Sequence, residues 1–251
     1  MLGDAAVVAN NDDIDANSSS SSSSASTLAT TVAATSSWGD DVAFKIVFSD
    51  GSQTLKLVSL MPRIVELARA SPSRPIKVAA AELLHSLVLF VLGSNAQTSE
   101  PKPLGNFYAH VMPAMLRLAV DVDFVTRQLF EPLALQLVHY FARPVAGSGG
   151  REYAETAAIV QSLVDAVGDA SDGALRDFAA QAIAEFLHWA IKQTNDATLK
   201  TDPVHVKSLL KRLYVMASHP APTQRLGFAL AVVKLHRVLR EQPQLVDRFG
   251  Q

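Results

Sequence analysis

Residues 172–191 read DGALRDFAAQAIAEFLHWAI, and this stretch decides the fold. Its apolar residues recur every three or four positions, which places them on one stripe of an α-helix: Leu175, Phe178, Ala179, Ala182, Ile183, Phe186, Leu187 and Ala190. Asp172 precedes the first of them and is a candidate N-cap, because its carboxylate can accept a backbone N–H of the first turn. A helix with one apolar stripe needs partners that bury it.

The same design recurs along the chain at a spacing near 50 residues. A short turn, a basic residue and an Ala/Leu-rich run appear at Lys77, Arg127, Arg176 and Arg225, at intervals of 50, 49 and 49 residues. Another apolar helix precedes each run. Two-helix units of roughly 40–47 residues are typical of HEAT and armadillo arrays. The chain is therefore predicted to be all-α, a right-handed α-solenoid of about four HEAT-like helix pairs, with an irregular helical bundle as the alternative.

Two N-terminal segments depart from this pattern. Residues 1–37 combine four aspartates with an uninterrupted serine run at 18–24. They predict a disordered acidic tail, because such a composition has little apolar surface to bury. Residues 38–251 form the predicted solenoid segment. At its start, AFKIVF followed by Asp50-Gly51 predicts a short hairpin or arm at 42–58.

Helix boundaries follow from the caps and prolines. The first pair is predicted at Thr54–Ala70 and Pro75–Gly93, with Pro62 bending the first helix and Gly93 capping the second. The later pairs are predicted at about 106–120 and 123–142, at 152–168 and 172–193, and from Asp202 to near Glu241.

The composition excludes several classes of protein. The chain is 49% hydrophobic and has no cysteine, which rules out disulfides, thiolate zinc sites and cysteine nucleophiles. The longest apolar run, residues 78–92, contains Glu82 and His85 and is too short to span a bilayer. No signal-peptide pattern opens the chain. These features predict a soluble, intracellular protein without a membrane partner.

No catalytic constellation is recognisable. The seven histidines are scattered, without the i, i+4 pair or HExxH motif of helical zinc sites. The nucleophile elbow, the P-loop and the kinase signatures are missing as well. Carboxylate pairs such as Asp121 and Asp123 flank turns, where helix capping explains them. We therefore expect no catalytic residue, no metal site and no cofactor in this chain.

Charge is distributed unevenly. Residues 1–191 carry 12 Lys/Arg and 20 Asp/Glu, whereas residues 192–251 carry 10 Lys/Arg and 4 Asp/Glu. Two clusters in the basic part are candidate DNA-binding or partner-binding residues: Lys207, Lys211 and Arg212 on one predicted helix, and Lys234, Arg237 and Arg240 on the next. Phosphates are attracted to such clusters regardless of sequence. A solvated helix face without a ligand is the alternative.

Four phrases carry a family resemblance: VAAAELLHSLVLFVLG at 78–93, VTRQLFEPL at 125–133, LRDFAAQAIAEFLHWAIKQ at 175–193 and QRLGF at 224–228. From about Trp38 to its end, the chain resembles one continuous segment of the DNA-dependent protein kinase catalytic subunit family, among the phosphoinositide-3-kinase-like kinases. The segment that it resembles lies in the N-terminal, circular-cradle HEAT-repeat region.

The resemblance implies a fragment that acts as a non-catalytic scaffold in nuclear DNA double-strand break repair by non-homologous end joining. It implies the Ku heterodimer, DNA ends and adjoining helical repeats as partners. The full-length proteins of this family are serine/threonine kinases, but no residue for ATP, magnesium or phosphotransfer can be carried over to this chain. An independent α-solenoid adaptor that binds an acidic protein or peptide is the alternative function.

Overall fold

A computed structural model describes residue 38 and residues 45–47, 54–97, 103–143, 152–194 and 204–241. Their elements in chain order are β1 (Lys45–Val47), β2 (Thr54–Lys56), the 3₁₀ turn η1 (Leu57–Leu60), α2 (Met61–Ala70), α3 (Arg74–Gln97), α4 (Gly105–Leu118), α5 (Phe124–Phe141), α6 (Ala154–Val167), α7 (Gly173–Gln193), α9 (Val204–Ala217) and α10 (Pro222–Glu241). The described part of the chain is thus mainly helical, as the sequence predicts. The predicted acidic tail at 1–37 lies outside the described residues.

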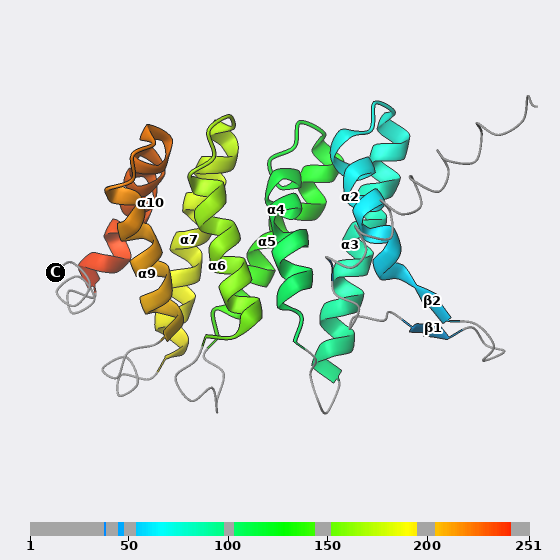
Figure 1. The fold of residues 1–251 in the computed structure, drawn as a ribbon, viewed down its shortest axis with the longest axis horizontal. Coiled ribbons are helices and arrows are strands. Elements are labelled where there is room, and N and C mark those ends of the chain that lie inside the picture. The colour runs from blue at the N-terminus through cyan, green and yellow to red at the C-terminus, as the bar shows by residue number, and fades with distance from the viewer. Residues whose placement is uncertain are drawn as a thin grey trace, which may run out of the picture.

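The helices stand side by side along the longest axis of the molecule (Figure 1). Each of the pairs α2/α3, α4/α5, α6/α7 and α9/α10 is in contact within itself. The first helices of the pairs also contact one another in order, α2 with α4, α4 with α6 and α6 with α9. The second helices do the same, α3 with α5, α5 with α7 and α7 with α10. The helices therefore lie in two layers, one of first helices and one of second helices.

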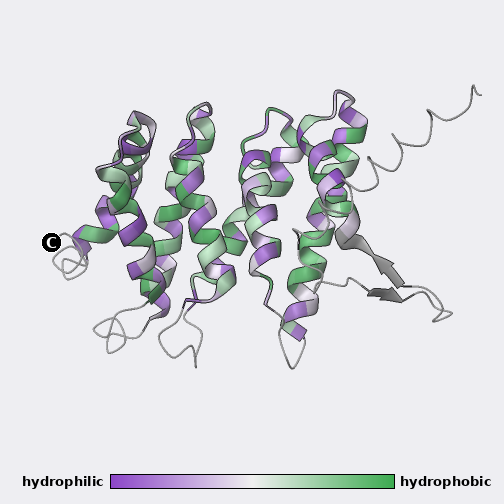
Figure 2. Ribbon diagram, viewed as in Figure 1, coloured by the Kyte–Doolittle hydropathy of each residue, from purple (hydrophilic) through white to green (hydrophobic). Residues whose placement is uncertain are grey.

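The predicted apolar stripe of α7 is buried. Seven of its eight residues are inaccessible to solvent, and Phe178 is half-buried. Asp172 is the N-cap, as predicted, because its Oδ1 accepts the backbone N–H of Leu175 at 3.0 Å. The stripe belongs to one continuous apolar core that extends from Trp38 to Leu235. Hydrophilic residues interrupt the apolar ones along every helix (Figure 2), as expected for helices with one buried side.

Two short strands lie within residues 42–58, where the sequence predicts a hairpin or arm. Strands β1 and β2 pair antiparallel, with Lys45 opposite Lys56 and Val47 opposite Thr54. The Asp50-Gly51 turn lies outside the described residues. Trp38, only 7% exposed, stacks its ring on His110 of α4 at 5.1 Å between ring centroids. Trp38 therefore belongs to the helical core.

Two predicted helix boundaries are wrong. Residues 54–60 form β2 and η1, and α2 begins only at Met61, with Pro62 in its first turn. Proline suits this position because the first helical N–H groups have no partner within the helix. Pro62 therefore lies at the start of α2 and does not bend a helix, contrary to the prediction. Gly93 caps nothing, because α3 continues to Gln97. Glycine often ends helices, but here its backbone keeps the helical conformation.

We predict opposite effects for alanine at two helical glycines. A Cβ on Gly93 would meet nothing within 4 Å, so Gly93→Ala should raise the free energy of unfolding by about 0.5–1 kcal/mol. A Cβ on Gly227 would lie 2.3 Å from the carbonyl oxygen of Val167, so Gly227→Ala should destabilise the protein. Urea unfolding followed by circular dichroism measures both. A stabilised Gly227→Ala variant would contradict the close contact between α10 and α6.

Candidate nucleic-acid interface

The first cluster of candidate basic residues lies on α9. The side of this helix predicted to be apolar, formed by Val206, Leu209, Leu210 and Leu213, is buried. Lys211 is exposed, whereas Lys207 and Arg212 are partly buried. Of the three, Lys211 is therefore the residue most accessible to a ligand.

Arg212 binds to the neighbouring helix pair. Its Nη1 donates to Gln161 Oε1 at 2.7 Å and to the carbonyl oxygen of Ala157 at 3.3 Å. Its Nη2 lies 3.5 Å from Glu152 Oε2, which also accepts the hydroxyl of Ser208 at 2.8 Å. These contacts join α9 to α6 and to Glu152, two residues before α6 begins. The sequence grouped Arg212 with Lys211, but the structure gives Arg212 acceptors in its own chain.

We predict that the two residues differ in their effect on stability. Arg212→Glu would place a second carboxylate beside Glu152, whose Oε1 is buried without a hydrogen-bond partner. The free energy of unfolding should fall by about 1–3 kcal/mol. Lys211→Glu, the matched control on the exposed side, should change it by less than about 0.5 kcal/mol. Thermal or urea unfolding measures both, and equal losses would remove the structural role of Arg212.

The second cluster of candidate residues is exposed on α10. Lys234, Arg237 and Arg240 follow one another at intervals of three residues. The Nε of Arg237 lies 4.0 Å from Glu241 Oε1, with 82% and 62% of the two side chains exposed, so this ion pair contributes little. Residues 204–241, all of which the structure describes, carry seven Lys/Arg and one Glu. The pair α9/α10 is therefore the basic end of the described chain.

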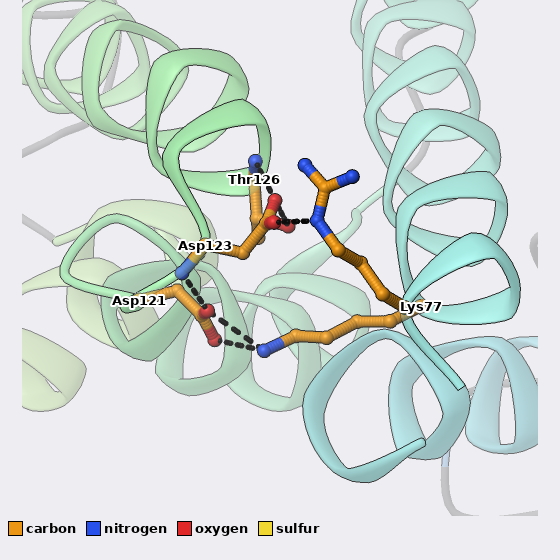
Figure 3. Close-up of polar contacts among 5 residues, drawn as sticks. Lys77, Asp121, Asp123 and Thr126 are labelled. Carbon is orange, nitrogen blue, oxygen red and sulfur yellow. Dashed lines mark hydrogen bonds and ion pairs between the residues drawn. The ribbon is translucent and has the colours of Figure 1, made fainter. Parts of the chain in front are cut away.

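The acidic pair Asp121 and Asp123 works as the sequence predicts, at a helix start. Asp123 Oδ2 accepts the backbone N–H of Thr126 at 3.0 Å, and Asp121 Oδ1 accepts the backbone N–H of Asp123 at 2.8 Å (Figure 3). The hydrogen bond from the Thr126 backbone, together with Arg74, lowers the pKa of Asp123. Both carboxylates serve as caps, so neither is available as a catalytic acid or base.

The same turn also binds the preceding helix pair, which sequence reasoning missed. Lys77 Nζ lies 2.7 Å from both carboxylate oxygens of Asp121, and Arg74 Nε lies 2.7 Å from Asp123 Oδ1 (Figure 3). The next turn repeats the arrangement, since Arg117 Nη2 of α4 lies 2.7 Å from Asp169 Oδ2. Lys77 and Asp121 are each only about 15% exposed, so solvent screens this pair less than a surface pair.

Asp169 organises the turn before α7. Its Oδ1 accepts the backbone N–H groups of Ser171 and Asp172, both at 2.9 Å. Burial raises the pKa of Asp169, but these hydrogen bonds and the one from Arg117 outweigh burial and hold the pKa well below its ordinary value. The ionised form is therefore the one that the fold stabilises.

This pKa shift predicts an acid-dependent loss of stability. A carboxylate with a lowered folded-state pKa contributes stability above its unfolded pKa, about 3.9, and this contribution is lost as the pH falls toward the folded pKa. Asp169→Asn should lower the free energy of unfolding by about 1–2 kcal/mol at pH 7. The difference from the parent should shrink below about pH 4. Urea unfolding of the variant and the parent from pH 7 to pH 3 measures this difference in the free energy of unfolding. A difference independent of pH would contradict the stabilising role of the ionised Asp169 carboxylate.

The remaining features of the described chain are possible metal ligands and a helix long enough to cross a membrane. Within the described ranges, no group of three or more His, Asp or Glu side chains could hold a metal ion. Among the described helices, α3 alone is long and apolar enough to cross a membrane by length and composition. One such helix is weak evidence of a membrane span, because core helices of soluble proteins have the same properties, and α3 packs against α2 and α5.

Comparisons with known proteins agree with one another. The profile of the family described as "DNA-dependent protein kinase catalytic subunit, CC1/2" matches residues 102–250. The DNA-dependent protein kinase catalytic subunit of Canis lupus familiaris is 42% identical over 212 residues, or 83% of this chain. The proteins of that name from Gallus gallus and Dictyostelium discoideum are each 40% identical, over 85% and 83% of this chain. The chain spans about 5% of the length of these relatives.

Proposed function

Because the chain belongs to the family of the DNA-dependent protein kinase catalytic subunit, we propose that it is a non-catalytic, helical-repeat scaffold segment of such a kinase. The proposed process is DNA double-strand break repair by non-homologous end joining, in the nucleus. The proposed partners are the Ku heterodimer, DNA ends and adjoining helical repeats. The family match carries this proposal, and the arrangement of the helices supports it.

The proposed architecture is a right-handed, HEAT-like α-solenoid. When the second helices are aligned on Lys77, Arg127, Arg176 and Arg225, one position is buried in all four. This position is occupied by Leu87, Leu137, Phe186 and Leu235, of which none is more than 6% exposed. An apolar residue at the same register in every second helix is what repeated stacking of one unit requires.

A recurrent basic residue supports the same repeat. Arg176 Nη1 donates to the carbonyl oxygen of Asp169 at 2.8 Å, and Arg225 Nη1 donates to that of His219 at 2.8 Å. Both arginines thus bind a carbonyl of the turn that precedes their own helix. Two residues 49 positions apart thus make similar contacts, and this similarity supports the proposed repeat.

Under the same alignment, the basic residues of α10 fall into two groups, which differ in the exposure of the residues aligned with them. Lys234 and Arg237 fall at the register of Glu185 and His188 in α7, which are partly or fully exposed. Arg240 falls at the register of Ile191 in α7 and of the buried Ala142 after α5. We therefore propose Lys234 and Arg237, together with Lys211, as the residues that contact DNA phosphates or an acidic partner.

The charge-reversed variant Lys234→Glu/Arg237→Glu tests this assignment. Binding to blunt-ended duplex DNA should weaken, and the slope of log K against log salt should become shallower by about two, because each phosphate contact contributes about 0.9. Titrations across a salt series, with and without Ku, measure both quantities. Arg69→Glu/Arg127→Glu is the matched control, because both arginines are exposed on the first two helix pairs. Unchanged binding, or an equal loss in the control, would refute the DNA contact while leaving the scaffold proposal intact.

A further inference from the structure

An aromatic residue followed three positions later by a cation occurs at the same place on two neighbouring helices. Tyr140 and Arg143 form this pair at the end of α5, and Trp189 and Lys192 form it 49 residues later at the end of α7. The guanidinium carbon of Arg143 lies 5.7 Å from the centre of the Tyr140 ring. Lys192 Nζ lies 5.0 Å from the centre of the Trp189 ring. In both pairs the aromatic ring holds the cation by a cation–π interaction.

The two pairs belong to one surface. Arg143 and Lys192 are exposed, Tyr140 is 39% exposed, and Trp189 is half-buried. His139 connects them, because its ring centroid lies 4.8 Å from that of Trp189 and Arg143 follows it by four residues, the spacing that places side chains on the same side of a helix. This surface lies on the layer of second helices, whereas Lys211 is on α9 in the layer of first helices.

The chain's own contacts show which chemistry this surface accepts. His139 Nε2 already lies 3.1 Å from a carboxylate oxygen of Glu185. Arginine and lysine N–H groups fixed in place by aromatic rings are suited to further carboxylates. Base stacking in single-stranded nucleic acid needs an accessible ring face. The Trp189 ring, however, already contacts His139 and Lys192. The surface therefore fits carboxylates better than nucleobases.

The separation of the pairs suggests the form of the ligand. Packed helices lie about 8–10 Å apart, and an extended chain rises about 3.3 Å per residue. Two cations on adjacent helices therefore match two carboxylates about three residues apart in an extended peptide. We propose that Tyr140, Arg143, Trp189 and Lys192 form a docking surface for an extended acidic segment of a protein partner. This proposal goes beyond DNA binding by α9 and α10, and either proposal can fail without the other.

The probe is a fluorescein-labelled peptide of repeated Asp-Ser-Pro units, whose carboxylates recur every third residue and whose prolines prevent helix formation. Fluorescence anisotropy with the full chain measures its affinity. Arg143→Glu/Lys192→Glu should weaken binding by about tenfold or more. The matched control Arg69→Glu/Arg127→Glu makes the same charge change on α2 and in the first turn of α5, outside both proposed binding surfaces, and should change affinity by less than about twofold. Circular dichroism checks that the variants are folded, and Arg143→Gln/Lys192→Gln replaces the first variant if it is not.

Tryptophan fluorescence gives a second, local readout. Peptide binding should alter the emission of Trp189, and Trp189→Phe should abolish that change, because Trp38 is buried against His110. Failure of the parent chain to bind the peptide would overturn the proposal, as would an equal loss of affinity in the control variant. Tighter binding of an oligothymidine of similar length, lost in the Arg143/Lys192 variant, would assign the surface to nucleic acid instead.

Discussion

Burial of one apolar stripe per helix is the interaction on which the rest of this structure depends. The stripe of α7 is covered by α5, α6 and α10, which come from three successive helix pairs. Fully burying a side chain such as Phe186 or Leu187 contributes about 1.5–3 kcal/mol, and no single pair encloses α7 by itself. Each pair therefore depends on its neighbours for part of its buried surface, and the core is continuous along the described part of the chain.

Charged residues at the turns refine this packing by fixing how one pair sits on the next. Asp121 and Asp169 occupy successive turns, and each binds a cation of the preceding helix pair at 2.7 Å. Apolar packing tolerates small sliding movements, whereas an ion pair at 2.7 Å is sensitive to them. The turn before α10 contains His219 in place of an aspartate, and Gln224 reaches the carbonyl oxygen of Gly168 at 3.5 Å instead. At this turn a neutral hydrogen bond thus replaces the ion pair, and Arg212 with Glu152 provides the ionic contact between the last two pairs.

The sequence predicted those features that local chemistry decides. The stripe of α7, its Asp172 cap and the capping role of Asp123 all depend on residues within one or two turns of a helix. Gly93 was misjudged because glycine ends helices in one context and continues them in another, and local sequence does not distinguish the two. The contacts of Arg212 could not be read from the sequence for a different reason. Its acceptors on α6 lie more than 50 residues earlier, and only the packing of α9 on α6 brings them near.

The same limitation explains why the cation–aromatic pairs were not recognised from sequence. Tyrosines and tryptophans are few in the chain, and their low number alone argues against an aromatic surface. Their positions matter more than their number, because Tyr140 and Trp189 occupy one register on adjacent helices. Sequence spacing alone does not show that these two residues lie on neighbouring helices, and only the contact between α5 and α7 does so. Arg212 and Lys77 bind acceptors within the chain, whereas Arg143 and Lys192 are exposed, so the latter two are the cations that a partner can reach.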